Sequence, residues 1–144
     1  MVSQGRGIFY FPHRREAMPM WIPYNPNPRG RTVGDCTIRA LAKATGKSWY
    51  DVYTGVSLDG YQLADMMSAN HVWGAYLRRN GWRRRLIPDD APDDYTVADF
   101  AADHPCGTYI LALDGHVMTV QDGDWYDTWD SGAEIPIYYW TEEN

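Results

Sequence analysis

The sequence lacks any long apolar run and has few cysteines. No run approaches the roughly 18 to 20 apolar residues that a membrane span needs, and the N-terminus lacks the features of a signal peptide. We therefore expect a soluble, cytoplasmic protein with no membrane partner. The two cysteines, Cys36 and Cys106, show no Cys-x-x-Cys spacing and no neighbouring ligand cluster. We expect two free thiols, no metal site and no cofactor.

Basic residues are also scarce, which bears on the choice of partner. The 144-residue chain has 13 Lys and Arg against 19 Asp and Glu, so its formal net charge is -6. This balance disfavours a general attraction to nucleic acid. The arginines that gather in residues 78–85 are followed at once by aspartates in residues 89–94, a pattern typical of a solvated, self-neutralising surface. We expect no nucleic-acid partner.

Composition and proline placement suggest one domain with an N-terminal extension. Apolar residues make up 44% of the chain and aromatics 15%, enough for a single core at this length. Prolines gather in the first 33 residues, which show no sustained periodicity. Because Met20 can serve as a second translation start, we interpret residues 1–19 as a dispensable extension and 20–144 as one domain.

The hydrophobic periodicity changes from helical to strand-like along the chain. Helical spacing and capping residues predict helices at 36–45 and 97–103, a short helix at 49–53, and a helix that Ser68 caps and that runs to residue 80. Apolar and aromatic runs predict strands at 107–113, 116–120, 125–129 and 135–140. We therefore predict an α+β fold in which N-terminal helices pack on one side of a C-terminal antiparallel sheet, and the Cys36 helix crosses that sheet.

Cys36 lies at the start of its helix, after Asp35, a good N-cap residue. There the helix macrodipole and unpaired N–H groups stabilise a thiolate. A nucleophilic thiol also needs a base, and His116 begins a predicted strand. A two-residue turn after that strand places Asp127 on the face of His116, whereas a three-residue turn places Asp130 there. The residues alone leave both aspartates open.

These segments together resemble the papain-like cysteine peptidase superfamily. The "GDC" that opens the helix is similar to the Asp-Cys of the bacteriocin-processing, double-glycine-leader peptidases. Four further stretches resemble uncharacterised papain-like proteins of bacteria and their phages, over about residues 20 to 140. They are "NPNPRGRTVGDCTIRALAKATGKSW", "SANHVWGAYLRRNGW", "YTVADFAADHPCGTYILAL" and "GHVMTVQDGDWYDTWDSG".

The resemblance implies a papain-like fold with Cys36 as nucleophile, His116 as general base and Asp130 as the orienting third member. Asp130 is preferred over Asp127 because it lies 14 residues after His116, a usual spacing in these enzymes. The resemblance also implies a cytoplasmic location in a bacterium or a phage-infected host cell. The position of the usual oxyanion Gln is occupied by Gly30, so this sequence departs from the pattern there.

The oxyanion donors expected instead are the Cys36 backbone N–H together with the side chain of Asn27 or Asn25, although both asparagines also suit the Asn-Pro turns. The leading hypothesis is a thiol hydrolase that cleaves an amide, peptide or isopeptide bond in a peptide or protein substrate. Acyl transfer and deamidation are open variants of this chemistry. The alternative is a catalytically silent papain-like scaffold that binds another protein.

Overall fold

The computed structural model describes residues 18–143, so most of the expected extension, residues 1–17, lies outside the described residues. The elements in chain order are β1 (Trp21–Pro23), α1 (Cys36–Thr45), α2 (Trp49–Leu63), α3 (Asn70–Arg79), β2 (Trp82–Leu86), α4 (Val97–Asp103), β3 (Thr108–Leu113), β4 (His116–Gln121), β5 (Asp124–Asp127) and β6 (Tyr138–Glu142). None of these helices, within the part of the chain described, is long and apolar enough to cross a bilayer.

The strands form one mixed sheet, in the order β1-β5-β4-β3-β6-β2. All neighbours are antiparallel except β1 and β5, which run parallel. The α+β class is thus confirmed for the described residues. The prediction of a purely antiparallel sheet from residues 107–140 is incomplete, because β1 and β2 come from earlier in the chain and form its two edges.

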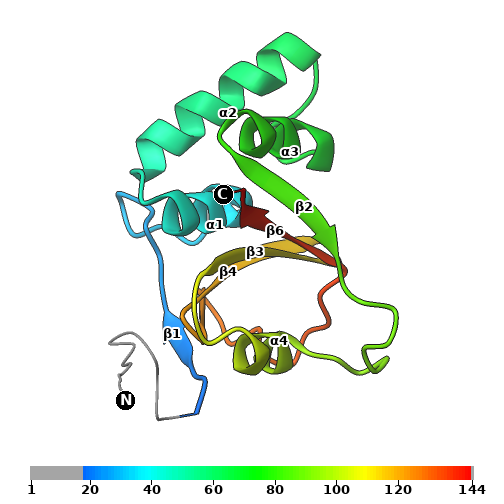
Figure 1. The fold of residues 1–144 in the computed structure, drawn as a ribbon. Coiled ribbons are helices and arrows are strands. Elements are labelled where there is room, and N and C mark those ends of the chain that lie inside the picture. The colour runs from blue at the N-terminus through cyan, green and yellow to red at the C-terminus, as the bar shows by residue number, and fades with distance from the viewer. Residues whose placement is uncertain (1–17, 144) are drawn as a thin grey trace, which may run out of the picture.

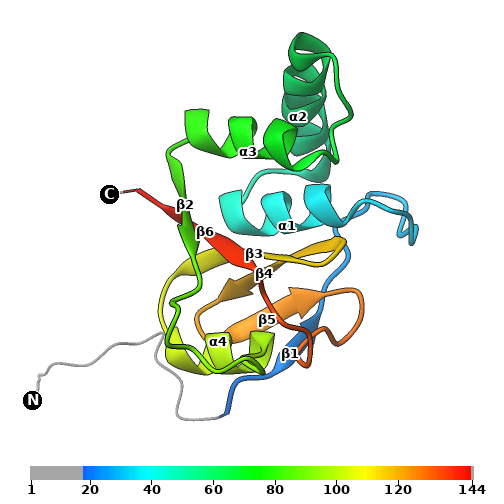
Figure 2. The same cartoon turned by 90° about the vertical axis from the view of Figure 1, so that its right-hand side faces the viewer.

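Helices cover both faces of this sheet (Figure 1, Figure 2). Helices α1, α2 and α3 lie on one face, and α4 lies on the other. The N-terminal helices thus pack on one side of the sheet as expected, whereas α4, which comes later in the chain, covers the other face. The apolar residues of α4, Val97, Phe100 and Ala101, bury themselves against the second face of the sheet, which carries Leu111 and Met118.

The prediction that the Cys36 helix crosses the sheet is confirmed. Helix α1 packs across β4 and touches β3 and β5. Its buried Ile38 and Leu41 join the core cluster that also contains Ile110 and Val117 of the sheet. The buried Thr119 hydroxyl donates a 2.7 Å hydrogen bond to the Ala40 carbonyl, which fixes α1 on β4.

A two-residue turn joins β4 to β5. Asp122 and Gly123 both have positive φ, at 51° and 87°, and Gln121 pairs with Asp124. Left-handed values at both central residues are typical of the type I′ turn that Asp-Gly favours in hairpins. This turn sets the register that decides which aspartate lies near His116.

Candidate active site

Helix α1 places Cys36 at its first position, with the thiol half-buried. Asp35 occupies the N-cap position, but its carboxylate accepts no capping hydrogen bond from a backbone N–H of the helix, contrary to expectation. It pairs instead with Arg39 one turn later and accepts a 2.9 Å hydrogen bond from the Trp49 indole and a 3.4 Å bond from Asn27. Asp35 therefore fixes the approach of the chain to Cys36 rather than capping the helix.

Strand β4 places His116 beside this helix start. Leu113 pairs with His116 across the turn at Asp114 and Gly115, so the ring lies at the end of the hairpin. Its Nε2 lies 2.6 Å from Asp127 Oδ2, and the ring is near enough to the Cys36 thiol for the two groups to shift each other's pKa. Because Asp127 occupies Nε2, Nδ1 is the ring nitrogen left for the thiol. The structure thus brings Cys36, His116 and Asp127 into one row.

Asp127 is buried, with its carboxylate fully engaged. Besides His116, Oδ2 accepts a 2.7 Å bond from the Ser131 hydroxyl, and Oδ1 accepts a 2.8 Å bond from the Thr128 N–H. Arg39 lies 3.6 Å from Oδ1. These contacts hold the carboxylate in one orientation toward the imidazole.

The structure places Asp127, not Asp130, at the His116 ring, which corrects the preference for Asp130. The two-residue turn after β4 produces the register that favours Asp127. Asp130 instead accepts a 2.8 Å hydrogen bond from the Trp125 indole and a 3.0 Å bond from the Gly132 N–H. Its carboxylate therefore stabilises the turn that follows β5.

The electrostatics of the row favour a thiolate and an imidazolium. Burial raises the pKa of the Cys36 thiol, but hydrogen bonds from His116 and from the Val117 N–H, with the charges of His116 and Arg39, lower it overall. Burial likewise lowers the pKa of His116, but hydrogen bonds with Asp127 and Cys36 raise it to about 9. The two groups stabilise each other in their charged forms.

A cleft of about 370 Å³ opens beside Cys36, and we call it the Cys36 cleft. It is lined by Gly34, Cys36, Thr37, Ser68, Asn70, Ala112, Leu113, Gly115, His116 and Val117. The Cys36 N–H belongs to the first turn of α1, where helix N–H groups have no intrahelical partner. It is thus available to a carbonyl oxygen that enters the cleft.

The expected side-chain donors, Asn27 and Asn25, are used elsewhere. The Asn25 amide donates to the Arg31 carbonyl, and the Asn27 oxygen accepts from the backbone N–H groups of Arg29 and Arg31. Neither asparagine lines the Cys36 cleft. Both shape the Asn-Pro turns, as their alternative interpretation predicted.

Two residues missed by sequence reasoning belong to this site. Asn70, the first residue of α3, lines the Cys36 cleft, and its oxygen accepts a 3.2 Å bond from the Trp73 indole, which leaves its NH₂ group able to donate. Arg39 is buried between Asp35 and Asp127. The Asp-x-x-x-Arg spacing is typical of an i,i+4 ion pair and was a usable signal for Arg39. No sequence signal marked Asn70.

His104 and the arginines of β2 take part in structural contacts of their own. His104 hydrogen-bonds the Phe100 carbonyl through Nδ1 at 2.7 Å and stacks on the Phe100 ring, as a structural histidine does. Arg83 pairs with Glu143, and Arg84 lies over the Tyr138 ring. Within residues 18–143 no group of three or more His, Cys, Asp or Glu side chains is arranged to hold a metal ion.

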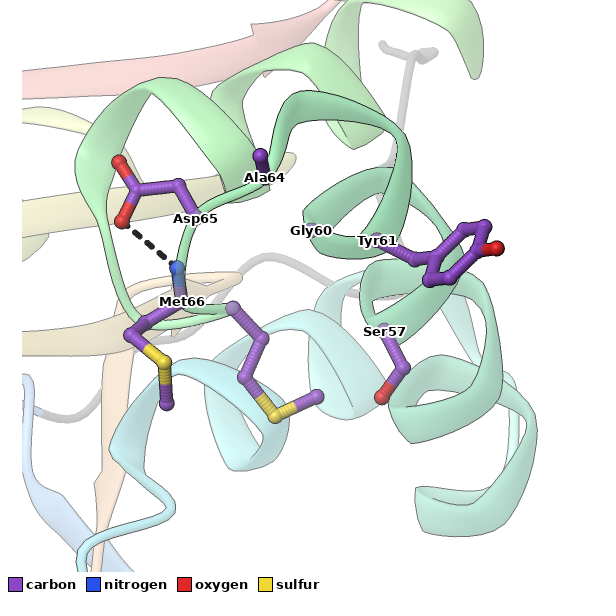
Figure 3. Close-up of a pocket in the computed structure, with 7 residues that line it drawn as sticks. Ser57, Gly60, Tyr61, Ala64, Asp65 and Met66 are labelled. Atoms are coloured by element: carbon purple, nitrogen blue, oxygen red, sulfur yellow. Dashed lines mark hydrogen bonds between the residues drawn. The ribbon is translucent and has the colours of Figure 1, made fainter.

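A second, more open hollow of about 460 Å³ lies at the C-terminal end of α2 (Figure 3). Tyr61 and Met66 are exposed beside it, and Asp65 Oδ1 accepts a 2.7 Å bond from the Met66 N–H. His71 lies 3.0 Å from the other Asp65 oxygen. The residues that line it include no cysteine, so it offers no second thiol centre.

Comparisons of the chain with protein-family models, with curated proteins and with solved structures found no match.

Proposed function

We propose that this chain is a papain-like thiol hydrolase that acts on an amide, peptide or isopeptide bond. The observation that carries the proposal is the row of Cys36, His116 and Asp127, in which the pKa of the thiol is lowered and that of the imidazole is raised. A thiolate beside an imidazolium is the resting state that a cysteine nucleophile needs.

In the first half of the reaction the Cys36 thiolate attacks the carbonyl carbon, and a C–S bond forms. The carbonyl oxygen then carries the negative charge of a tetrahedral intermediate. The C–N bond breaks as Nδ1 of His116 gives its proton to the leaving amine. The products of this half are a free amine, an acyl thioester on Cys36 and a neutral imidazole.

In the second half, neutral His116 takes a proton from water, and the oxygen of that water attacks the thioester carbon. The C–S bond breaks, the acid leaves, and the thiolate and imidazolium are restored. Asp127 holds the ring in the orientation that both transfers require and stabilises its charge. An amine in place of water gives acyl transfer, and a carboxamide side chain as substrate gives deamidation.

The developing oxyanion needs donors that are already in place. The N–H of Cys36 supplies one from the first turn of α1. The side-chain NH₂ of Asn70 is our candidate for the second, because it lines the same cleft and its oxygen is anchored on Trp73. Asn70 thus takes the role first assigned to Asn27 or Asn25.

The alternative is a catalytically silent protein-binding scaffold, and the exposed apolar side chains of α2 support it. Tyr50, Leu58 and Tyr61 on this helix are 60%, 56% and 85% exposed. Exposed apolar patches of this kind mark interaction surfaces. A scaffold would use this surface without using Cys36, so the two functions predict different effects of a Cys36 substitution.

A peptide library separates these functions. The full chain and its Cys36→Ala variant are each incubated with a library of peptides from a bacterial proteome, and the products are identified by mass spectrometry. A hydrolase yields new termini that are absent with Cys36→Ala. Equal product sets, or none from the full chain, would contradict the proposal.

A further inference from the structure

A third cavity, of about 320 Å³, adjoins the Cys36 cleft, and we call it the side pocket. The cavity and the cleft share Gly34, Thr37 and Ser68 in their walls. A substrate whose carbonyl lies at Cys36 therefore has a neighbouring group within reach of the side pocket. Its volume falls at the small end of ligand sites and suits one large side chain.

The walls of the side pocket are mainly apolar. They include Val33, Ile38, Trp49, Tyr53 and Met67. Trp49 and Tyr53 stack at 4.9 Å between ring centroids, and Trp49 and Met67 pack against the core. This support keeps the aromatic wall in place, so the pocket is formed before a ligand enters.

The charged groups of the side pocket do not favour a basic ligand. Asp35 is buried, is paired with Arg39 and accepts the Trp49 and Asn27 hydrogen bonds, so its carboxylate is occupied. Arg31 also lines the pocket, and no carboxylate among the described residues forms an ion pair with it. A lysine or arginine side chain of a ligand would meet this positive charge without a free anion.

We propose that the side pocket is a specificity site that receives one large apolar side chain, aromatic or branched aliphatic, from the residue next to the cleaved bond. The inference rests on the proposed hydrolase function, because it assigns the substrate class for the same site. The expected order of preference is apolar first, acidic second and basic last.

The test uses small probes that need no catalysis. A chain with ¹³C-labelled Val, Ile and Met methyl groups is titrated with the N-acetyl amides of phenylalanine, leucine, glutamate and lysine. We expect the phenylalanine and leucine probes to shift the methyl signals of Val33, Ile38 and Met67. They should bind about tenfold or more tightly than the lysine probe.

Two variants make the test specific. Val33 is 38% exposed and lies outside the helices and strands, so Val33→Arg should fold normally. This substitution should lower the affinity for the phenylalanine probe by about tenfold and raise the affinity for the glutamate probe, because it adds a cation to an apolar wall. The matched control is Tyr61→Ser, which removes an exposed apolar group outside the side pocket and should change neither probe.

Three results would overturn the proposal: no shift at Val33, Ile38 and Met67, equal binding of phenylalanine and lysine probes, or equal effects of the two variants. A separate measurement of Cys36 alkylation by iodoacetamide at pH 6 keeps this failure distinct from failure of the hydrolase function. Fast alkylation without probe binding would rule out only the role of the side pocket as a specificity site. Slow alkylation would rule out the proposed hydrolase function, and with it the specificity site, which depends on that function.

Discussion

Replacing Asp127 with asparagine removes a negative charge 2.6 Å from His116 Nε2 while keeping the shape of the side chain. In the native protein the pKa of His116 is raised from 6.5 to about 9. At about 1.4 kcal/mol for each pH unit, this corresponds to roughly 3 kcal/mol in favour of the protonated ring. Burial opposes the rise, and Asp127 and Cys36 together produce it, with Asp127 the larger contributor.

We therefore expect Asp127→Asn to lower the pKa of His116 by about 1 to 2 pH units. The assay is an NMR titration of the His116 ring carbon and proton signals between pH 5 and 10. It needs no substrate, so it reads the imidazole directly. A Cys36→Ala chain with and without Asp127→Asn separates the effect of the carboxylate from that of the thiolate.

Asp130→Asn is the matched control, because Asp130 bonds the Trp125 indole and not the ring of His116. It should leave the titration of His116 unchanged. The role of Asp127 is refuted if wild-type His116 titrates near 6.5, or if Asp130→Asn moves the pKa of His116 more than Asp127→Asn does. Either result would mean that Asp127 does not stabilise the imidazolium.

Three further outcomes are expected. Asn70→Ala should lower peptide turnover by about a hundredfold yet leave alkylation of Cys36 at pH 6 unchanged, because an oxyanion donor acts only in the transition state; equal loss in both assays would contradict its role. Arg39→Met should lower the free energy of unfolding in urea by about 3 to 5 kcal/mol, since it leaves the buried Asp35 without its cation and removes a second positive charge from Asp127, and a loss under 1 kcal/mol would argue against these ion pairs. In a Cys36→Ala chain Asp127 still raises the pKa of His116, although the contribution of the thiol is lost. The protonated ring should therefore stabilise the fold fully below pH 6.5, and this stabilisation, roughly 1 to 3 kcal/mol, should be lost as the pH rises from there, before about 9. Urea titrations across this range that show no decline would contradict the raised pKa.

The elements set by local signals could be predicted from the sequence. Thr96 and Asp99 form the reciprocal capping box that begins α4, and Gly46 ends α1 with a φ of 75°. The Asp122-Gly123 turn joins β4 to β5 as its residue types favour. In each case residues close in sequence determine the conformation, so no distant contact is needed to recognise it.

The two edge strands depend on distant contacts and were not predicted. Strand β1 has only three residues, and it pairs with β5, whose Asp127 carbonyl accepts hydrogen bonds from the Trp21 indole and the Tyr24 N–H. Strand β2 is rich in arginine, and its pairing with β6 makes it a strand. The expectation of a short helix at 49–53 is wrong in length, because α2 runs on to Leu63. It passes through Gly55, where an added Cβ would lie 2.6 Å from the Tyr76 ring of α3, so packing against α3 extends this helix.

The choice of aspartate needed the structure for a similar reason. The sequence allowed two hairpin registers, and the spacing expected from the resemblance favoured Asp130. What holds Asp130 away is the Trp125 indole, and what holds Asp127 in place is a set of contacts with Thr128, Ser131 and Arg39. Arg39 lies on a different element, so no local pattern connects it to Asp127.

The rate of Cys36 alkylation by iodoacetamide at pH 6 tests the central claim most directly, with Cys106 in the same chain as internal reference. If helix start and imidazolium both stabilise the thiolate, Cys36 should react much faster than Cys106 at this pH. His116→Ala should slow Cys36 more at pH 6 than at pH 9, and leave Cys106 unchanged. Equal rates for the two cysteines, unaffected by His116→Ala, would show that Cys36 is an ordinary thiol and would contradict the account.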